Sequence, residues 1–151
     1  MCDYIKYTWE QFDLDIQNIS QKLRSVSWVP EVIVGIVRGG AVPAICLSHS
    51  LNVPDVRFVE WSNRNSCNKE TKKWDLICAV ANNKKVLVVE DIIDSGVTLE
   101  QLKERSFDCN SMKYAAMWYN IDCPININFW ANTISRKQDE RWLRFPWENY
   151  N

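Results

Sequence analysis

The chain has 151 residues, which suits one domain with one hydrophobic core over residues 1–151. Its 18 Lys and Arg against 19 Asp and Glu give a net charge of -1, and this balance argues against a nucleic-acid or membrane-surface protein, which would carry a basic excess. The N-terminal segment has no long apolar run, and the six cysteines include no C-x-x-C pair, so the expected location is the reducing cytoplasm.

The first half of the chain is predicted to alternate helices with strands. Thr8 and Gln11 form a capping-box pattern, and the apolar residues after them repeat at helical spacing. The expected elements are a helix over 9–24, a buried strand over 32–37, a helix over 41–51 and a strand over 56–61. The stretch 62–74 is polar and aperiodic, which predicts a long mobile loop, and such a loop inside a compact domain is usually functional or disordered.

The second half continues the alternation. The expected elements are a short strand over 76–80, a turn over 82–84, a strand over 86–89, a helix over 98–104 and a strand over 114–118. Residues 120–128 are Asn-rich and predicted to be irregular. Alternating strands and helices indicate an α/β fold with a mostly parallel, twisted sheet flanked by helices, similar to a Rossmann fold.

Polar residues gather where the most apolar of these strands ends. Glu90 and Asp91 follow four apolar residues, and ionised carboxylates accept hydrogen bonds from the hydroxyls of a ribose. The turn over 94–98 leads into a helix, so its backbone N–H groups and the positive helix end form an anion site. Gly96 permits the tight turn, and Ser95 and Thr98 add hydroxyl donors.

This stretch, VLVVEDIIDSGVT over Val86–Thr98, resembles the phosphoribosyl diphosphate (PRPP) motif of type I phosphoribosyltransferases. Val32–Ala44 resembles the pyrophosphate loop of the small microbial xanthine-guanine and hypoxanthine branch. Asp139–Glu148 resembles the small C-terminal hood that binds the purine in that branch. Order and spacing agree from Val32 to the C-terminus, so the resemblance covers most of the chain.

The resemblance implies roles for the residues around the sugar phosphate. Glu90 and Asp91 would hold the ribose hydroxyls, and Asp91 would lie near a Mg²⁺ ion bound mainly by PRPP oxygens. Asp94 would act as general base beside the purine N7. The 5-phosphate would be bound by Asp94, Ser95, Gly96, Val97 and Thr98, and the pyrophosphate by Arg38, Gly39 and Gly40. Similar enzymes have a non-proline cis peptide at the step equivalent to Arg38–Gly39.

The resemblance also implies a base pocket and a lid. Trp142 would stack on the purine, and the backbone of Leu143 would meet its exocyclic group. The 62–74 loop would close over PRPP, with Arg64, Lys69, Lys72 and Lys73 as candidate pyrophosphate contacts. Members that use 6-oxopurines have a Lys after the next strand, whereas this chain has Tyr119 or Asn120 there, and Asn120 is the candidate base contact.

The expected function is transfer of the phosphoribosyl group from PRPP to a purine base, with a 6-oxopurine such as guanine, xanthine or hypoxanthine favoured. One alternative is a non-catalytic PRPP- or nucleotide-binding regulator of the same fold, and another is transfer to a different base. The presence of both Asp94 and Arg38 favours the enzyme. The expected partners are PRPP, a purine base and further copies of the chain in a dimer or tetramer, but no nucleic acid or membrane.

Overall fold

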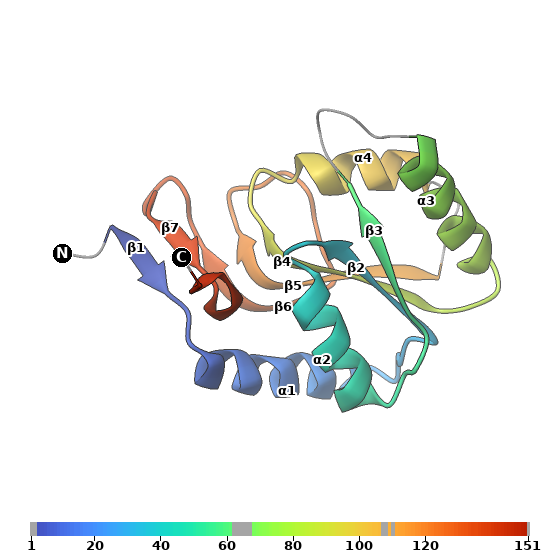
Figure 1. Cartoon of the computed structure of the whole chain (residues 1–151), viewed down its shortest axis with the longest axis horizontal. Coiled ribbons are helices and arrows are strands. Elements are labelled where there is room, and N and C mark those ends of the chain that lie inside the picture. Colours follow the sequence, from blue (N-terminus) through green and yellow to red (C-terminus); the bar gives the residue numbers. More distant parts are fainter. Residues whose placement is uncertain (1–2, 62–67, 107–108, 110, 151) are drawn as a thin grey trace.

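The computed structural model describes residues 3–61, 68–106, 109 and 111–150 (Figure 1). Its elements in chain order are β1 (Tyr4–Lys6), α1 (Trp9–Ser25), β2 (Val32–Val37), α2 (Ala41–Leu51), β3 (Val56–Glu60), α3 (Asn68–Val80), β4 (Val86–Ile93), α4 (Val97–Arg105), β5 (Met112–Asn120), β6 (Phe129–Ile134), β7 (Trp142–Arg144) and a 3₁₀ helix, η1 (Pro146–Glu148).

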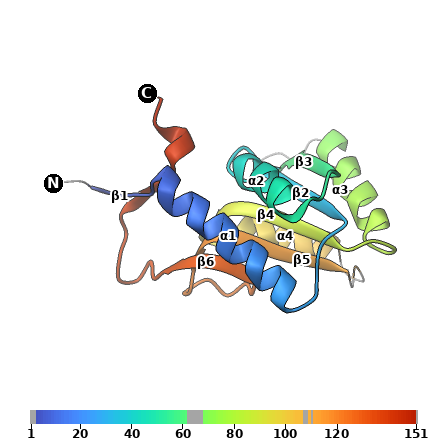
Figure 2. The same ribbon diagram turned by 90° about the horizontal axis from the view of Figure 1, so that it is seen from below.

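A five-stranded parallel sheet in the order β3-β2-β4-β5-β6 forms the centre of the molecule. Helices α1 and α2 cover one face, and α3 and α4 cover the other (Figures 1 and 2). Successive side chains of a strand point to opposite faces of the sheet. Because helices cover both faces, the side chains on both sides of β2 must be apolar. Val34 packs in the core beneath α3 and α4, while its neighbour Ile33 packs beneath α1 and α2. The predicted α/β fold class is therefore confirmed.

Helix α1 begins where the capping box predicts. Thr8 Oγ1 accepts a hydrogen bond from Gln11 N at 3.1 Å, and Gln11 Oε1 accepts one from Thr8 N at 2.9 Å. These two bonds satisfy N–H groups that have no partner within the first turn. The bounds of β2 and α2 agree with the prediction at both ends.

Helix α3 corrects two predictions. Residues 68–74 are helical rather than part of a loop, and residues 76–80 are helical rather than a strand. The physical reason is a narrow apolar stripe in a polar sequence: Trp74, Ile77 and Ala81 are all buried against the sheet. Lys69, Lys72 and Lys73 therefore belong to a helix, and Lys73 pairs with Glu70 at 3.0 Å. Arg64 and the rest of 62–67 lie outside the described residues.

A second sheet joins residues from the two ends of the described chain. Strand β1 pairs in parallel with β7, with Tyr4 opposite Trp142 and Lys6 opposite Arg144. We call this two-stranded sheet, together with η1, the hood. Aromatic contacts anchor the hood to α1: the ring centroids of Trp147 and Phe12 are 5.1 Å apart. The sequence predicted a C-terminal hood, but not the contribution of β1, and it did not predict β6.

No helix within the described ranges combines the length and the apolar character that crossing a bilayer requires.

Candidate active site

The two acids of the predicted ribose site lie within β4, not after it. Pairing between β2 and β4 stops at Gly35 and Val89, while β5 continues to pair with β4 as far as Ile93. The strand is longer than the predicted 86–89 because Glu90, Ile92 and Ile93 also pair with β5. The chain leaving β2 turns away at Arg38, so Asp91 on β4 lies beside that turn.

Gly39 fits closely against Asp91. A Cβ placed on residue 39 would lie 2.1 Å from Asp91 Oδ2, well inside any allowed contact, so only glycine fits here. Gly40 is also confined, since a Cβ there would lie 2.3 Å from the carbonyl oxygen of Val89. The predicted cis peptide at Arg38–Gly39 is wrong by one bond, because the cis bond joins Val37 to Arg38.

Burial dominates the electrostatics of the acid pair. It raises the pKa of Asp91 to about 6, and the charge of Glu148 adds to the rise. Burial also raises the pKa of Glu90 well above its usual range, with a further contribution from the charge of Asp91. In the described part of the chain, no Lys or Arg forms an ion pair with either carboxylate. The pair is therefore suited to ligands that donate hydrogen bonds or bring positive charge.

A divalent cation would find few protein ligands here. Among the described residues, no cluster of three or more His, Cys, Asp or Glu side chains could hold a metal ion. Asp91 offers a half-buried carboxylate that no described Lys or Arg pairs with, and its Oδ1 already accepts a hydrogen bond from Ile92 N at 2.7 Å. This donor set fits Mg²⁺, which commonly takes one or two protein carboxylates and completes its shell with substrate oxygens and water.

The turn between β4 and α4 has the geometry of an anion site. Gly96 adopts a φ of 82°, and a Cβ at that position would lie 2.5 Å from Cys123 Sγ, so the turn requires glycine. Gly96 is also the residue before α4 and offers no side-chain cap, which leaves the positive end of the helix facing the turn. Ser95 Oγ lies 3.4 Å from Val97 N. An anion such as a phosphate suits this turn.

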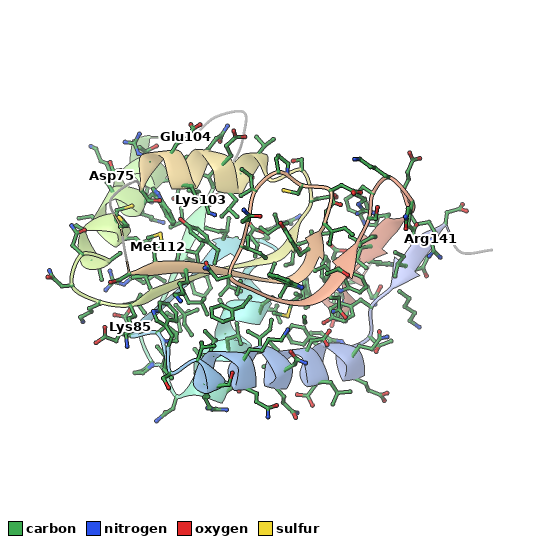
Figure 3. All side chains as sticks on the ribbon, turned by 180° about the vertical axis from the view of Figure 1, so that it is seen from behind. Asp75, Lys85, Lys103, Glu104, Met112 and Arg141 are labelled. Atoms are coloured by element: carbon green, nitrogen blue, oxygen red, sulfur yellow. The ribbon has the colours of Figure 1, made fainter. Side chains whose placement is uncertain are left out.

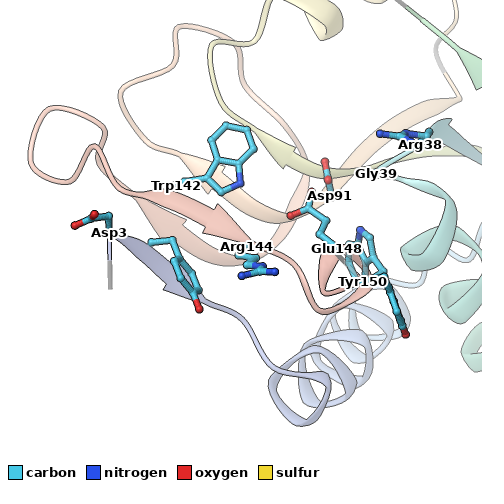
Figure 4. A pocket seen from close by; sticks show the side chains of 10 residues that line it. Asp3, Arg38, Gly39, Asp91, Trp142, Arg144, Glu148 and Tyr150 are labelled. Atoms are coloured by element: carbon cyan, nitrogen blue, oxygen red, sulfur yellow. The ribbon is translucent and has the colours of Figure 1, made fainter. Parts of the chain in front are cut away.

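A pocket of about 920 Å³ lies between this edge of the sheet and the hood (Figure 4). Its lining residues are Asp3, Tyr4, Arg38, Gly39, Asp91, Trp142, Arg144, Trp147, Glu148 and Tyr150. Trp142 is 67% exposed and faces Asp91 and Arg38 across the pocket. Leu143 is 3% exposed and packs into the core, so only its backbone could meet a ligand.

The structure brings together some of the predicted site residues in this pocket and places others beside it. The residues over 94–98 follow β4 and Asn120 ends β5, so both lie at the same edge of the sheet but outside the pocket lining. Asn120 is 6% exposed. Its Nδ2 donates to the carbonyl oxygen of Asp94 at 3.0 Å, and its Oδ1 accepts from the N–H groups of Asp122 and Arg136. These bonds make Asn120 a brace between loops.

Three residues of the site were missed by sequence reasoning. Arg136 forms two hydrogen bonds to the Asp94 carboxylate, and nothing in the polar segment around it indicates such a bond. Arg144 and Glu148 line the pocket from the hood. The signal for Arg144 was available, because residues two apart on a strand share a face and Trp142 was already assigned to the base.

An open parallel sheet with acids, a glycine turn and a helix N-terminus at its carboxyl edge is the layout of a protein that binds a sugar phosphate. The comparison with known families agrees. Residues 7–149 match the phosphoribosyl transferase domain, and the chain belongs to that family.

Individual relatives carry purine-related names. The chain is 25% identical over 152 residues to the xanthine-guanine phosphoribosyltransferase of Gluconobacter oxydans, an alignment that covers 96% of this chain and 84% of the relative. A purine phosphoribosyltransferase from Pyrococcus horikoshii superposes with a TM-score of 0.75 and 25% identity, over 99% of this chain and 96% of that one. The Helicobacter pylori xanthine-guanine-hypoxanthine phosphoribosyltransferase shares the fold, with a TM-score of 0.73 and 20% identity over 97% and 94% of the two chains.

Proposed function

We propose that this chain transfers the phosphoribosyl group from PRPP to a purine base, giving a nucleoside monophosphate and pyrophosphate, with a 6-oxopurine favoured. The bond between the ribose C1 and a pyrophosphate oxygen breaks, and a bond forms between C1 and a ring nitrogen of the base. The observation that carries this proposal is the pocket that places Trp142 across from Asp91 and Gly39 in a chain of this family.

The roles of the residues follow from their chemistry. The carboxylates of Glu90 and Asp91 accept hydrogen bonds from the ribose hydroxyls. The turn over 94–98 holds the 5-phosphate at the N-terminus of α4. Arg38, with the backbone at Gly39 and Gly40, binds the pyrophosphate that leaves.

The base lies on the hood side of the pocket. Trp142 offers an exposed indole face on which a purine stacks, and the backbone of Leu143 meets the exocyclic group. Asp94 takes the proton that the base loses when its ring nitrogen bonds to C1. Because the Asn120 amide is engaged with backbone groups, we no longer assign it a direct contact with the base.

Mg²⁺ is the cofactor we propose, held by Asp91 and by oxygens of PRPP. When bound, such an ion would supply positive charge against the charge that develops on pyrophosphate as it leaves. The support for this assignment is the half-buried Asp91 carboxylate, with which no Lys or Arg of the described residues forms an ion pair.

The deciding experiment is a screen of guanine, hypoxanthine, xanthine, adenine and uracil with PRPP and Mg²⁺, in which release of pyrophosphate is measured. We expect turnover with at least one 6-oxopurine. Turnover with adenine or uracil alone would assign a different base. Binding of PRPP in calorimetry without turnover of any base would instead assign the chain as a regulator.

The assembly and location that we propose are a homodimer or homotetramer in the cytoplasm. Free thiols support the location. No disulfide joins the cysteines among the described residues, which are Cys46, Cys78, Cys109 and Cys123. Light scattering on the purified protein measures its mass in solution and tests the assembly.

A further inference from the structure

The carboxylate of Asp94 is held by a side chain that has no assigned role. Arg136 Nε donates to Asp94 Oδ1 at 3.0 Å, and Arg136 Nη2 donates to Asp94 Oδ2 at 3.1 Å. Two parallel bonds between a guanidinium and a carboxylate fix the orientation of the carboxylate as well as its position. Arg136 is 21% exposed and Asp94 is 46% exposed, so the acid keeps a face open to a ligand.

The same guanidinium also binds the segment that leads into the hood. Arg136 Nη1 donates to the carbonyl oxygen of Arg141 at 2.6 Å and to that of Asp139 at 3.4 Å. Residue 141 immediately precedes Trp142, the proposed stacking residue. One side chain thus connects the acid at the end of β4 with the strand that carries the base platform.

The backbones on both sides of the ion pair are braced by Asn120. Its Nδ2 donates to the carbonyl oxygen of Asp94 at 3.0 Å, and its Oδ1 accepts from Arg136 N at 3.2 Å. Asp122 holds the next residues of the turn, since its Oδ2 accepts from Ser135 Oγ at 2.7 Å and from Lys137 N at 3.0 Å. The turn that presents Arg136 is therefore built by groups at the end of β5, and the ion pair is preorganised.

We propose that Arg136 is a positioning residue for the transfer reaction. It orients the Asp94 carboxylate toward the base, and it holds the backbone that leads into Trp142 next to that carboxylate. The inference rests on the proposed function, because it takes Asp94 as the proton acceptor. Arg136, which supplies the positive charge at this end of the site, comes from the connection between β6 and β7, and Asn120 holds its backbone in place. Preorganised contacts of this kind lower the barrier by keeping the reacting groups in place.

The test compares kcat and KM of the wild type with those of Arg136→Gln and Arg136→Lys. For Arg136→Gln we expect kcat to fall about tenfold or more at saturating base, since general-base catalysis contributes at least about a hundredfold. The KM for PRPP is expected to stay within about twofold, because in the phosphate turn Arg136 bonds the side chain of Asp94 and not the backbone N–H groups proposed to hold the 5-phosphate. Arg136→Lys keeps the positive charge but lacks the two parallel N–H donors of a guanidinium, so its kcat should lie between those of Arg136→Gln and the wild type.

A double variant separates positioning from general structural damage. In the Asp94→Asn background, Arg136→Gln is expected to change kcat by less than about twofold, because the carboxylate through which it acts is already gone. A structural role would instead lower kcat by the same factor in both backgrounds.

The chain offers a matched control for the loss of an ion pair. Arg105 binds Asp75 with the same two-bond geometry, at 2.8 and 3.0 Å, but joins α4 to α3. Asp75 lies at the opposite end of the molecule from Arg141 (Figure 3). Arg105→Gln is therefore expected to leave kcat and both KM values unchanged, while its thermal unfolding reports the cost of losing an exposed pair.

The outcomes are distinct. A wild type that turns over no base overturns both the proposed function and this inference. An active wild type overturns the inference alone if Arg136→Gln keeps or raises kcat, if Arg136→Lys keeps the full kcat, or if the loss is additive with Asp94→Asn. A fall in kcat that is absent from the Asp94→Asn background, with partial recovery in Arg136→Lys, supports it.

Discussion

Replacing Gly39 by Ala is expected to weaken use of PRPP by displacing Asp91. A Cβ at residue 39 would lie 2.1 Å from Asp91 Oδ2, so the carboxylate must retreat by about 1.3 Å to reach an ordinary contact. A misplacement of about 1 Å in an active site costs about a hundredfold in rate. We therefore expect kcat/KM for PRPP to fall about a hundredfold, which corresponds to about 2.7 kcal/mol.

Steady-state kinetics with varied PRPP measure this fall, and urea unfolding measures the accompanying strain. Overpacking of a tight contact costs about 1–3 kcal/mol of unfolding free energy. In the Asp91→Ala background the added methyl group meets no carboxylate, so Gly39→Ala should there cost little stability. The reasoning is refuted if Gly39→Ala retains the wild-type kcat/KM, or if it costs the same stability in both backgrounds.

Two further predictions concern charge and stacking. Burial raises the pKa of Asp91 to about 6, so as pH rises this carboxyl ionises in the unfolded chain before it ionises in the folded one. With Mg²⁺ and PRPP omitted, the unfolding free energy should therefore fall by about 3 kcal/mol between about pH 4 and 6. Urea unfolding at several pH values checks this, and an equal fall in Asp91→Asn would contradict it. Trp142→Ala should raise the KM for the base about tenfold to a hundredfold, since a stacked base contributes about 1–3 kcal/mol. Its melting temperature should stay near wild type because the indole is 67% exposed; an unchanged KM for the base would remove Trp142 from the site.

The local sequence pattern was sufficient to predict the elements at the carboxyl ends of β2 and β4. The run over 32–37 is apolar at every position except glycine and ends at Arg38, and the structure ends β2 at Val37. The turn after β4 was predicted because Gly96 and the following helix mark it within a few residues. In both cases the signal and the structure lie in the same short segment.

Elements that depend on distant partners could not be predicted in this way. Strand β1 has three residues and exists because β7, near the other end of the chain, pairs with it. Helix α3 is stabilised by Trp74 and Ile77 packing on the sheet, while its remaining residues are largely polar. The Arg136–Asp94 pair joins two loops that are adjacent only once β5 has paired with both β4 and β6.

The pairing of β1 with β7 has a consequence for how the protein is made. On the ribosome β1 emerges early, but its partner β7 is the last strand of the described chain to follow it. All five strands of the main sheet precede β7 in the chain, whereas the hood cannot form without β7. A released chain that ends before Trp142 would thus keep the residues of the phosphate turn but lack the platform for the base, so we expect it to bind PRPP without consuming it.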